Sequence, residues 1–128
     1  TVTAGATAPQ ICGLQVVTIS GASGSVANTG TDDSLNGDPA PSLGSAPAAD
    51  STVLATYYSK GNAVVSPPSG YTELNEFSGS ENHRMETAYD AASAAQSASW
   101  TTTNGATVGA LLEITPPRGK RSFALVIG

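Results

Sequence analysis

Large and charged side chains are scarce in this chain, where aromatic residues make up 5% and charged residues 12% of 128 positions. Serine, threonine, glycine and alanine take their place, so the hydrophobic fraction of 39% includes many residues that bury little area. A chain of this length forms one domain around a single modest core. The composition is typical of β-strands with small side chains joined by many turns.

The chain also has few cysteines and few basic residues. Cys12 is the only cysteine, which excludes an intrachain disulfide, and its apolar surroundings predict a small buried residue. The net charge of -5 argues against nucleic-acid binding, which requires a basic patch. Arg118, Lys120 and Arg121 form a short basic cluster, which indicates either a solvated turn or a contact with an acidic neighbouring subunit. No run approaches the about 18 apolar residues of a membrane-spanning helix.

Residues for catalysis are equally sparse. His83 is the only histidine, so a Ser-His-Asp triad would have to use it together with Ser80, Glu81 or Asp90. The chain has no Gly-x-Ser-x-Gly elbow, and the polar turn around His83 predicts a solvent-exposed side chain. One histidine and one cysteine in separate segments do not make a metal site. The sequence therefore predicts no enzyme, no cofactor and no metal.

Two groups of acidic residues raise the question of a chemical function, glycoside hydrolysis for one group and calcium binding for the other. Glycoside hydrolysis needs only two carboxyl groups at a suitable separation, but strand-borne acids usually serve solubility, so this activity is not expected. The acidic residues that raise the question are Glu73, Glu76, Glu81, Glu86 and Glu113. The run Asp32–Asp38 superficially resembles a calcium loop, yet its spacing does not match an EF-hand, which favours a polar turn.

The apolar pattern predicts an all-β fold. Apolar, β-branched segments alternate with turn signals, which is typical of an antiparallel β-sandwich of about eight strands, jelly-roll or immunoglobulin-like. The segment Val64–Phe77 is central, because Pro67, Pro68 and Gly70 form a rigid corner between two strands. The predicted strands are 11–19, a short one from Val26, 52–59, 71–77, 84–91, one that ends at Trp100, 107–114 and 122–127.

The same pattern divides the chain into parts. Residues 1–10 read as an extended arm, and residues 11–128 as a single sandwich domain with a long Pro-rich loop at 28–50. Apolar residues on both faces of Thr52–Ser59 predict a central strand. In Thr107–Ile114, the alternation predicts that four residues face inward: Val108, Ala110, Leu112 and Ile114.

Five segments together resemble β-sandwich modules of tailed-phage and prophage virion proteins. Ser66–Leu74 is similar to a "TPPSGWTLL" corner, with Tyr71 in place of tryptophan. Asp50–Tyr58 occupies the place of the strand before that corner, and Met85–Ala92 that of an "AxYKxA" strand after it, with Asp90 where a basic residue is common. Ser97–Thr102 and Gly109–Ile114 match a "TWT" strand and a final alternating strand, so the resemblance covers roughly half of the chain, in order.

This resemblance implies a non-enzymatic structural protein at the virion surface. Its expected role is a capsid decoration (cement) protein that docks on the particle as a homo-oligomer, or a tail module, with avidity from a symmetric lattice. Residues 1–10 and 28–50 are the segments expected to reach capsid or tail neighbours. The alternative is a tail or fibre carbohydrate-binding module, in which aromatic rings stack on sugars. With so few large side chains, the core is expected to claim most of the candidates Tyr57, Tyr58, Tyr71, Tyr89 and Trp100.

Overall fold

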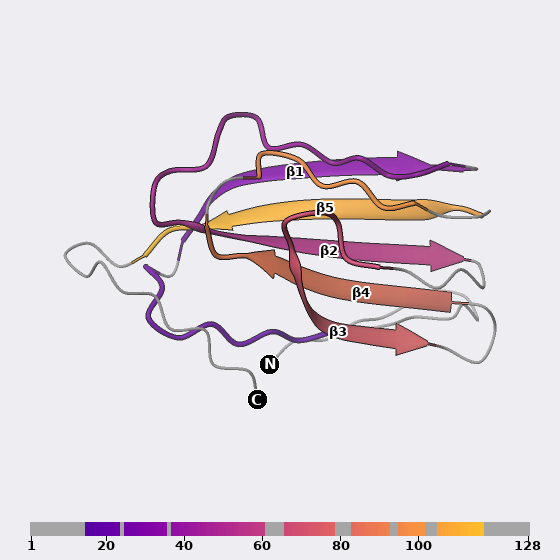
Figure 1. Ribbon diagram of the computed structural model, residues 1–128, viewed down its shortest axis with the longest axis horizontal. Helices are drawn as coiled ribbons and strands as arrows, with labels where there is room; N and C mark the ends of the chain where they lie inside the picture. The colour runs from indigo at the N-terminus through magenta and orange to yellow at the C-terminus, as the bar shows by residue number, and fades with distance from the viewer. Residues whose placement is uncertain are drawn as a thin grey trace, which may run out of the picture.

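The described residues form one antiparallel sheet of five strands with the order β1-β5-β2-β4-β3 (Figure 1). The computed structural model describes residues 15–23, 25–35, 37–60, 66–78, 83–92, 95–101 and 105–116, and these contain no helix. The strands are β1 (Val26–Ser34), β2 (Thr52–Lys60), β3 (Thr72–Ser78), β4 (His83–Asp90) and β5 (Thr107–Ile114). The all-β, antiparallel prediction is thus confirmed.

β2 lies at the centre of the sheet, as the apolar residues on both of its faces predict. Its register pairs Ala55 with Ala88 of β4 on one side and with Leu111 of β5 on the other. Val53 and Leu54, which point to opposite faces, are both buried. A strand that packs on both faces needs apolar residues at consecutive positions, which is the pattern of β2.

A second layer of extended chain covers one face of the sheet. It consists of residues 39–43 and 96–100, called here the covering ribbon, which run side by side over β1 and β5 (Figure 1). The Leu43 N–H donates to the Gln96 carbonyl at 2.9 Å, and the Ala98 N–H donates to the Pro41 carbonyl at 3.2 Å. The Trp100 N–H donates to the Pro39 carbonyl at 3.3 Å. Because proline has no N–H, the two prolines can only accept in this ribbon.

Two glycines let the covering ribbon lie close to the sheet. A Cβ atom at Gly30 of β1 would lie 2.1 Å from the Ser42 carbonyl oxygen. A Cβ atom at Gly109 of β5 would lie 2.9 Å from the Pro41 ring. Any larger residue at either position would therefore push the ribbon away from the sheet.

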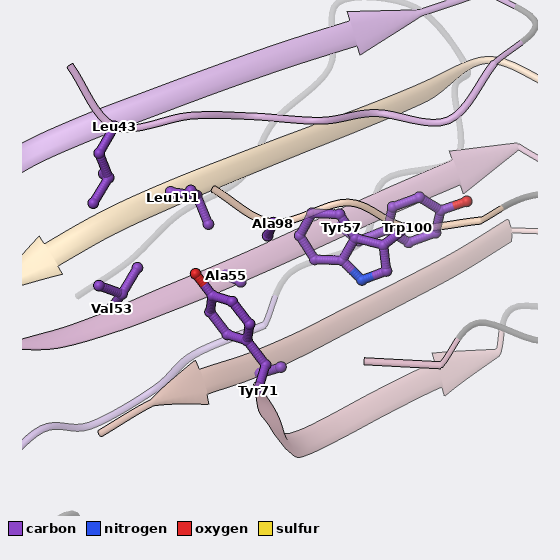
Figure 2. Close-up of a cluster of buried hydrophobic side chains, with 9 residues drawn as sticks. Leu43, Val53, Ala55, Tyr57, Tyr71, Ala98, Trp100 and Leu111 are labelled. Carbon is purple, nitrogen blue, oxygen red and sulfur yellow. The ribbon is translucent and has the colours of Figure 1, made fainter. Parts of the chain in front are cut away.

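The core lies between the sheet and the covering ribbon. The rings of Tyr57 and Trp100 stack with centroids 5.4 Å apart and an interplanar angle of 29° (Figure 2). Leu43 from the ribbon and Leu111 from β5 extend this cluster, and the Tyr71 ring lies beside Ala55 (Figure 2). Aromatic pairs of this kind add about 0.5–1.5 kcal/mol beyond their buried area.

The predicted corner before β3 is present. The Tyr71 N–H donates to the Pro68 carbonyl at 3.0 Å, and Gly70 has a φ of 87°, which a residue with a side chain rarely adopts. The turn ends on Tyr71, whose side chain is buried in the core. This corner therefore carries the chain across the covered face before β3 begins.

Several predictions of the sequence analysis are wrong in the described residues, among them the strand that ends at Trp100, since 95–100 is not one of the five strands. The first part of the supposed loop at 28–50 belongs to β1, because its small polar residues alternate against β5 and need no bulky side chain at a sheet edge. Residues 15–19 are not a strand. In β5, Gly109, Leu111 and Glu113 face the core, whereas Val108 is 47% exposed on the other face. The arm 1–10, Cys12, the basic cluster and the strand 122–127 lie outside the described residues.

Candidate functional site

Glu86 is a carboxylate buried in the core, with 0% of its surface exposed. The Trp100 indole N–H donates to its Oε1 atom at 3.3 Å, whereas its Oε2 atom has no hydrogen-bond partner among the described residues. Burial raises the pKa of Glu86 to about 7, the indole N–H lowers it, and the charges of Glu73 and Glu76 raise it further. Glu86 therefore takes up a proton near neutral pH, within a cluster of aromatic rings.

Two other carboxylates fix the covering layer on the sheet. Glu113 of β5 accepts hydrogen bonds at its Oε1 atom from the Ala48 N–H at 2.7 Å and from the Ser51 hydroxyl at 2.8 Å. Asp32 of β1 accepts one from the Ala40 N–H at 2.7 Å. Hydrogen bonds to a charged acceptor are about twice as strong as neutral ones. Glu113, which was considered for glycoside hydrolysis, and Asp32 therefore both position the backbone of the loop that follows β1.

Asp90 plays the same part at the end of β4. It accepts hydrogen bonds from the Ala92 N–H at 2.8 Å and from the Ala95 N–H at 3.0 Å, which turn the chain toward the covering ribbon. Burial, with a smaller contribution from the charge of Asp90, raises the pKa of Tyr71 to about 12. Tyr71 therefore stays neutral and serves as a core residue.

His83 is not the exposed turn residue that the sequence predicts. It begins β4 and is half-buried, because its ring stacks on Tyr58 with centroids 5.7 Å apart. The Tyr58 hydroxyl and the His83 Nδ1 atom are 2.6 Å apart and share a hydrogen bond. Asp90 lies at the opposite end of the same strand, about 23 Å away along the chain, so the two do not form a dyad. Ser80 and Glu81 lie outside the described residues.

The aromatic residues considered for sugar stacking do not form one exposed row. Tyr57, Tyr71 and Trp100 lie in the core, with 2%, 8% and 1% of their surfaces exposed. Tyr58 and Tyr89 are half-buried on the opposite face of the sheet. The expectation that the core takes most of the aromatic residues is confirmed for these three.

One end of the opposite face carries an apolar strip across four strands. Phe77 pairs with Met85, Met85 with Tyr58, and Tyr58 with Val108, so the four side chains lie next to one another. Phe77 is 50% and Val108 is 47% exposed, and the two between them are half-buried. These four residues are called here the open strip. Contiguous exposed apolar surface of this kind usually marks an interaction site.

The sequence analysis did not identify the open strip, because it placed Val108 in the core. Both faces of β5 carry apolar residues, so alternation alone could not decide which face is covered. Gly109 is the signal that decides, since only a glycine at that position lets Pro41 lie against the strand. The covered face of β5 could have been inferred from this pairing of a glycine with a proline-rich segment.

The acidic run Asp32–Asp38 does not gather metal-binding side chains within the described residues. Asp32 and Asp33 point to opposite faces of β1, and the described residues contain no group of three metal-binding side chains. The described part of the chain also contains no helix long and apolar enough to cross a membrane.

No protein-family model, curated protein or solved structure matches the sequence.

Proposed function

We propose that this protein is a non-enzymatic structural module of a tailed-phage particle, most simply a capsid decoration protein at the virion surface. The observation that carries the proposal is where the resembling segments lie. They supply β2, the corner at Tyr71, β4, Trp100 and β5, which together make the centre of the sheet and its core. The likeness therefore concerns residues that define the fold. As part of the same proposal, the complete chain forms a sandwich of about eight strands.

The acids that accept backbone hydrogen bonds support a structural role. Glu113, Asp32 and Asp90 each accept backbone hydrogen bonds that hold the covering layer in place. The open strip gives such a module a surface with which to dock. A module whose individual contacts are weak binds a symmetric lattice with high avidity when many copies occupy it.

Immunogold labelling of intact particles tests this proposal. An antibody raised against the chain should label the head evenly if the protein decorates the capsid. Label confined to the tail would move the module to host attachment and would favour the carbohydrate-binding alternative, which a glycan array would then test. Absence of label from all particles would overturn the virion assignment.

A chain that lacks residues 1–10 separates attachment from folding. The extended arm is expected to reach neighbouring subunits, so its deletion should reduce particle binding much more than the free energy of unfolding. Co-sedimentation of particles with the truncated and full chains measures the first quantity, and chemical denaturation the second. Full binding by the truncated chain would contradict a role for the arm.

A further inference from the structure

The segment from Gln15 to Ser23 crosses the face of the sheet that carries the open strip. At one end of this segment, the Ser23 N–H donates to the Thr115 carbonyl at 3.1 Å, immediately after β5 ends. At its other end, the Thr87 hydroxyl donates to the Gln15 Oε1 atom at 2.5 Å. Thr87 lies two residues from Met85 on β4, so the two side chains share a face. The indigo trace in Figure 1 follows this course, from the left end of the sheet toward the middle of the strands.

The register of the strands gives the direction of this segment. Thr87 pairs with Thr56 of β2, and Ile114, the last residue of β5, pairs with Thr52 of β2. From Ile114 to Thr87 the segment therefore advances roughly 13 Å along the strands and roughly 10 Å across them, toward β3. Phe77 lies two residues further along and one strand further across, roughly 8 Å from Thr87. The same diagonal thus leads to the Phe77 end of the open strip.

The residues just before Gln15 suit an apolar surface. They are uncharged and mostly apolar: Ile11, Cys12, Gly13 and Leu14. Three extended residues span roughly 10 Å, so Cys12 reaches Phe77 if the chain continues on its diagonal, and Leu14 passes Met85 on the way.

The other apolar segment outside the described residues, 122–127, is less well placed. It follows Pro116, at the end of the sheet where β5 ends, and Val108 lies roughly 20 Å from there along β5. The residues between Pro116 and Ser122 would have to be almost fully extended to cover this distance. Residues 11–14, in contrast, join the described chain directly beside the strip.

We propose that residues 11–14 pack as an extended segment on the Met85 and Phe77 end of the open strip of the same chain. Phe77 is 50% exposed, and burial of its remaining apolar surface stabilises this contact. Val108, three strands away, stays open for docking on a particle. The contact also directs residues 1–10 outward past β3, the last strand in the sheet order, toward a neighbouring subunit. The packing concerns the free protein, and only this consequence for the arm rests on the proposed function.

Cys12 allows the packing to be measured by disulfide formation in the free chain. Phe77→Cys places a second thiol at the proposed contact, and oxidised glutathione should rapidly produce an intrachain disulfide with Cys12. Val108→Cys is the matched control, because Val108 is 47% exposed on the same face and lies within reach of Cys12 if residues 11–14 move freely. Its disulfide should form about ten-fold more slowly, since a disulfide requires Cα atoms within about 7 Å. Peptide mapping identifies each bond, and circular dichroism establishes that both variants are folded.

Nuclear Overhauser contacts in the wild-type protein provide a measurement that needs no variant. The methyl groups of Ile11 or Leu14 should contact the Phe77 ring or the Met85 methyl group, and not Val108. Equal rates of disulfide formation at the two positions, or the absence of these contacts, would overturn the proposal.

Two further outcomes would assign the strip to another occupant and also overturn the proposal. Contacts of residues 122–127 with Phe77 would assign it to the C-terminal segment. Disulfide bonds that form only between chains would assign it to a second copy. Both measurements use the free protein, so their failure leaves the labelling of particles, and with it the proposed function, as an independent result.

Discussion

Gly30 shows how one missing side chain governs the packing of a whole layer. Its Cα lies so close to the covering ribbon that an added Cβ would meet the Ser42 carbonyl oxygen at 2.1 Å. The backbone of the ribbon cannot rotate away as a side chain can, so Gly30→Ala must displace it. We expect a loss of about 1–3 kcal/mol in the free energy of unfolding, measured by urea denaturation.

Gly44→Ala is the matched control for this substitution. A Cβ atom at Gly44 would lie 3.6 Å from the Asn28 Oδ1 atom, which is an ordinary contact. Its free energy of unfolding should stay within about 0.5 kcal/mol of the wild-type value, as is usual for surface sites. Equal losses for the two variants would contradict the close approach at Gly30.

Glu86 gives the stability of the protein a defined pH dependence. Its pKa rises from 4.5 to about 7 on folding, so between these values the folded state holds a proton that the unfolded state has released. Its contribution to stability is complete below about pH 4.5 and is lost as the pH rises through about 7. Relative to wild type, Glu86→Gln should gain about 1–3 kcal/mol across this range, since glutamine carries no charge to bury.

Urea denaturation of both proteins at a series of pH values measures this difference. The comparison cancels the titration of the other acids, which the two proteins share. A difference that stays constant from acid to neutral pH would show that Glu86 does not change its pKa on folding. The Trp100 indole remains a donor to the side-chain oxygen of glutamine, so the substitution preserves this hydrogen bond.

Among the elements, the covering ribbon should leave a distinct signature in amide hydrogen exchange. The N–H groups of Leu43, Ala98 and Trp100 donate to carbonyls across the ribbon and should exchange slowly. Ser42 and Ser99 are exposed and their N–H groups make no hydrogen bond within the described residues, so they should exchange much faster. Uniformly fast exchange along 39–43 and 96–100 would mean that the ribbon does not form a stable layer.

The strands were predictable where their side chains are large, and not where they are small. β2, β3, β4 and β5 carry apolar or aromatic residues at alternating positions, and their positions agree with the prediction to within a few residues. β1 reads VANTGTDDS, which contains few apolar residues because it is an edge strand under a thin cover. The layer above it depends on the close approach of Gly30 to Ser42 and of Gly109 to Pro39 and Pro41, which no local pattern encodes.

The burial of the acids was not predictable for a similar reason. Alternation places Glu86 and Glu113 on one face of β4 and β5, but it does not tell which face is covered. The partners of these carboxylates, such as Trp100 and Ser51, come from other segments of the chain. The open strip was not predictable either, because Val108 is exposed only where Gly109 faces the covering ribbon.

At the scale of the whole molecule, the ribbon and the sheet should unfold together. Trp100 is the only tryptophan, it is 1% exposed, and it joins the ribbon to β2 through Tyr57. Its fluorescence therefore reports on the ribbon, whereas far-ultraviolet circular dichroism reports on the sheet. We expect both signals to change at the same urea concentration, in a single transition. A fluorescence change at lower urea would show that the ribbon detaches first.

The strand order also has a consequence for synthesis on the ribosome. β5, the last strand of the sheet, lies between β1 and β2, so the sheet cannot be completed until residues up to Ile114 have been made. Until then β1 has no neighbour to pair with, and only β2, β4 and β3 can assemble. A nascent chain arrested before β5 should therefore remain sensitive to protease along β1, and the sheet should be completed only once β5 is available, on the slow timescale of sheets with distant pairings.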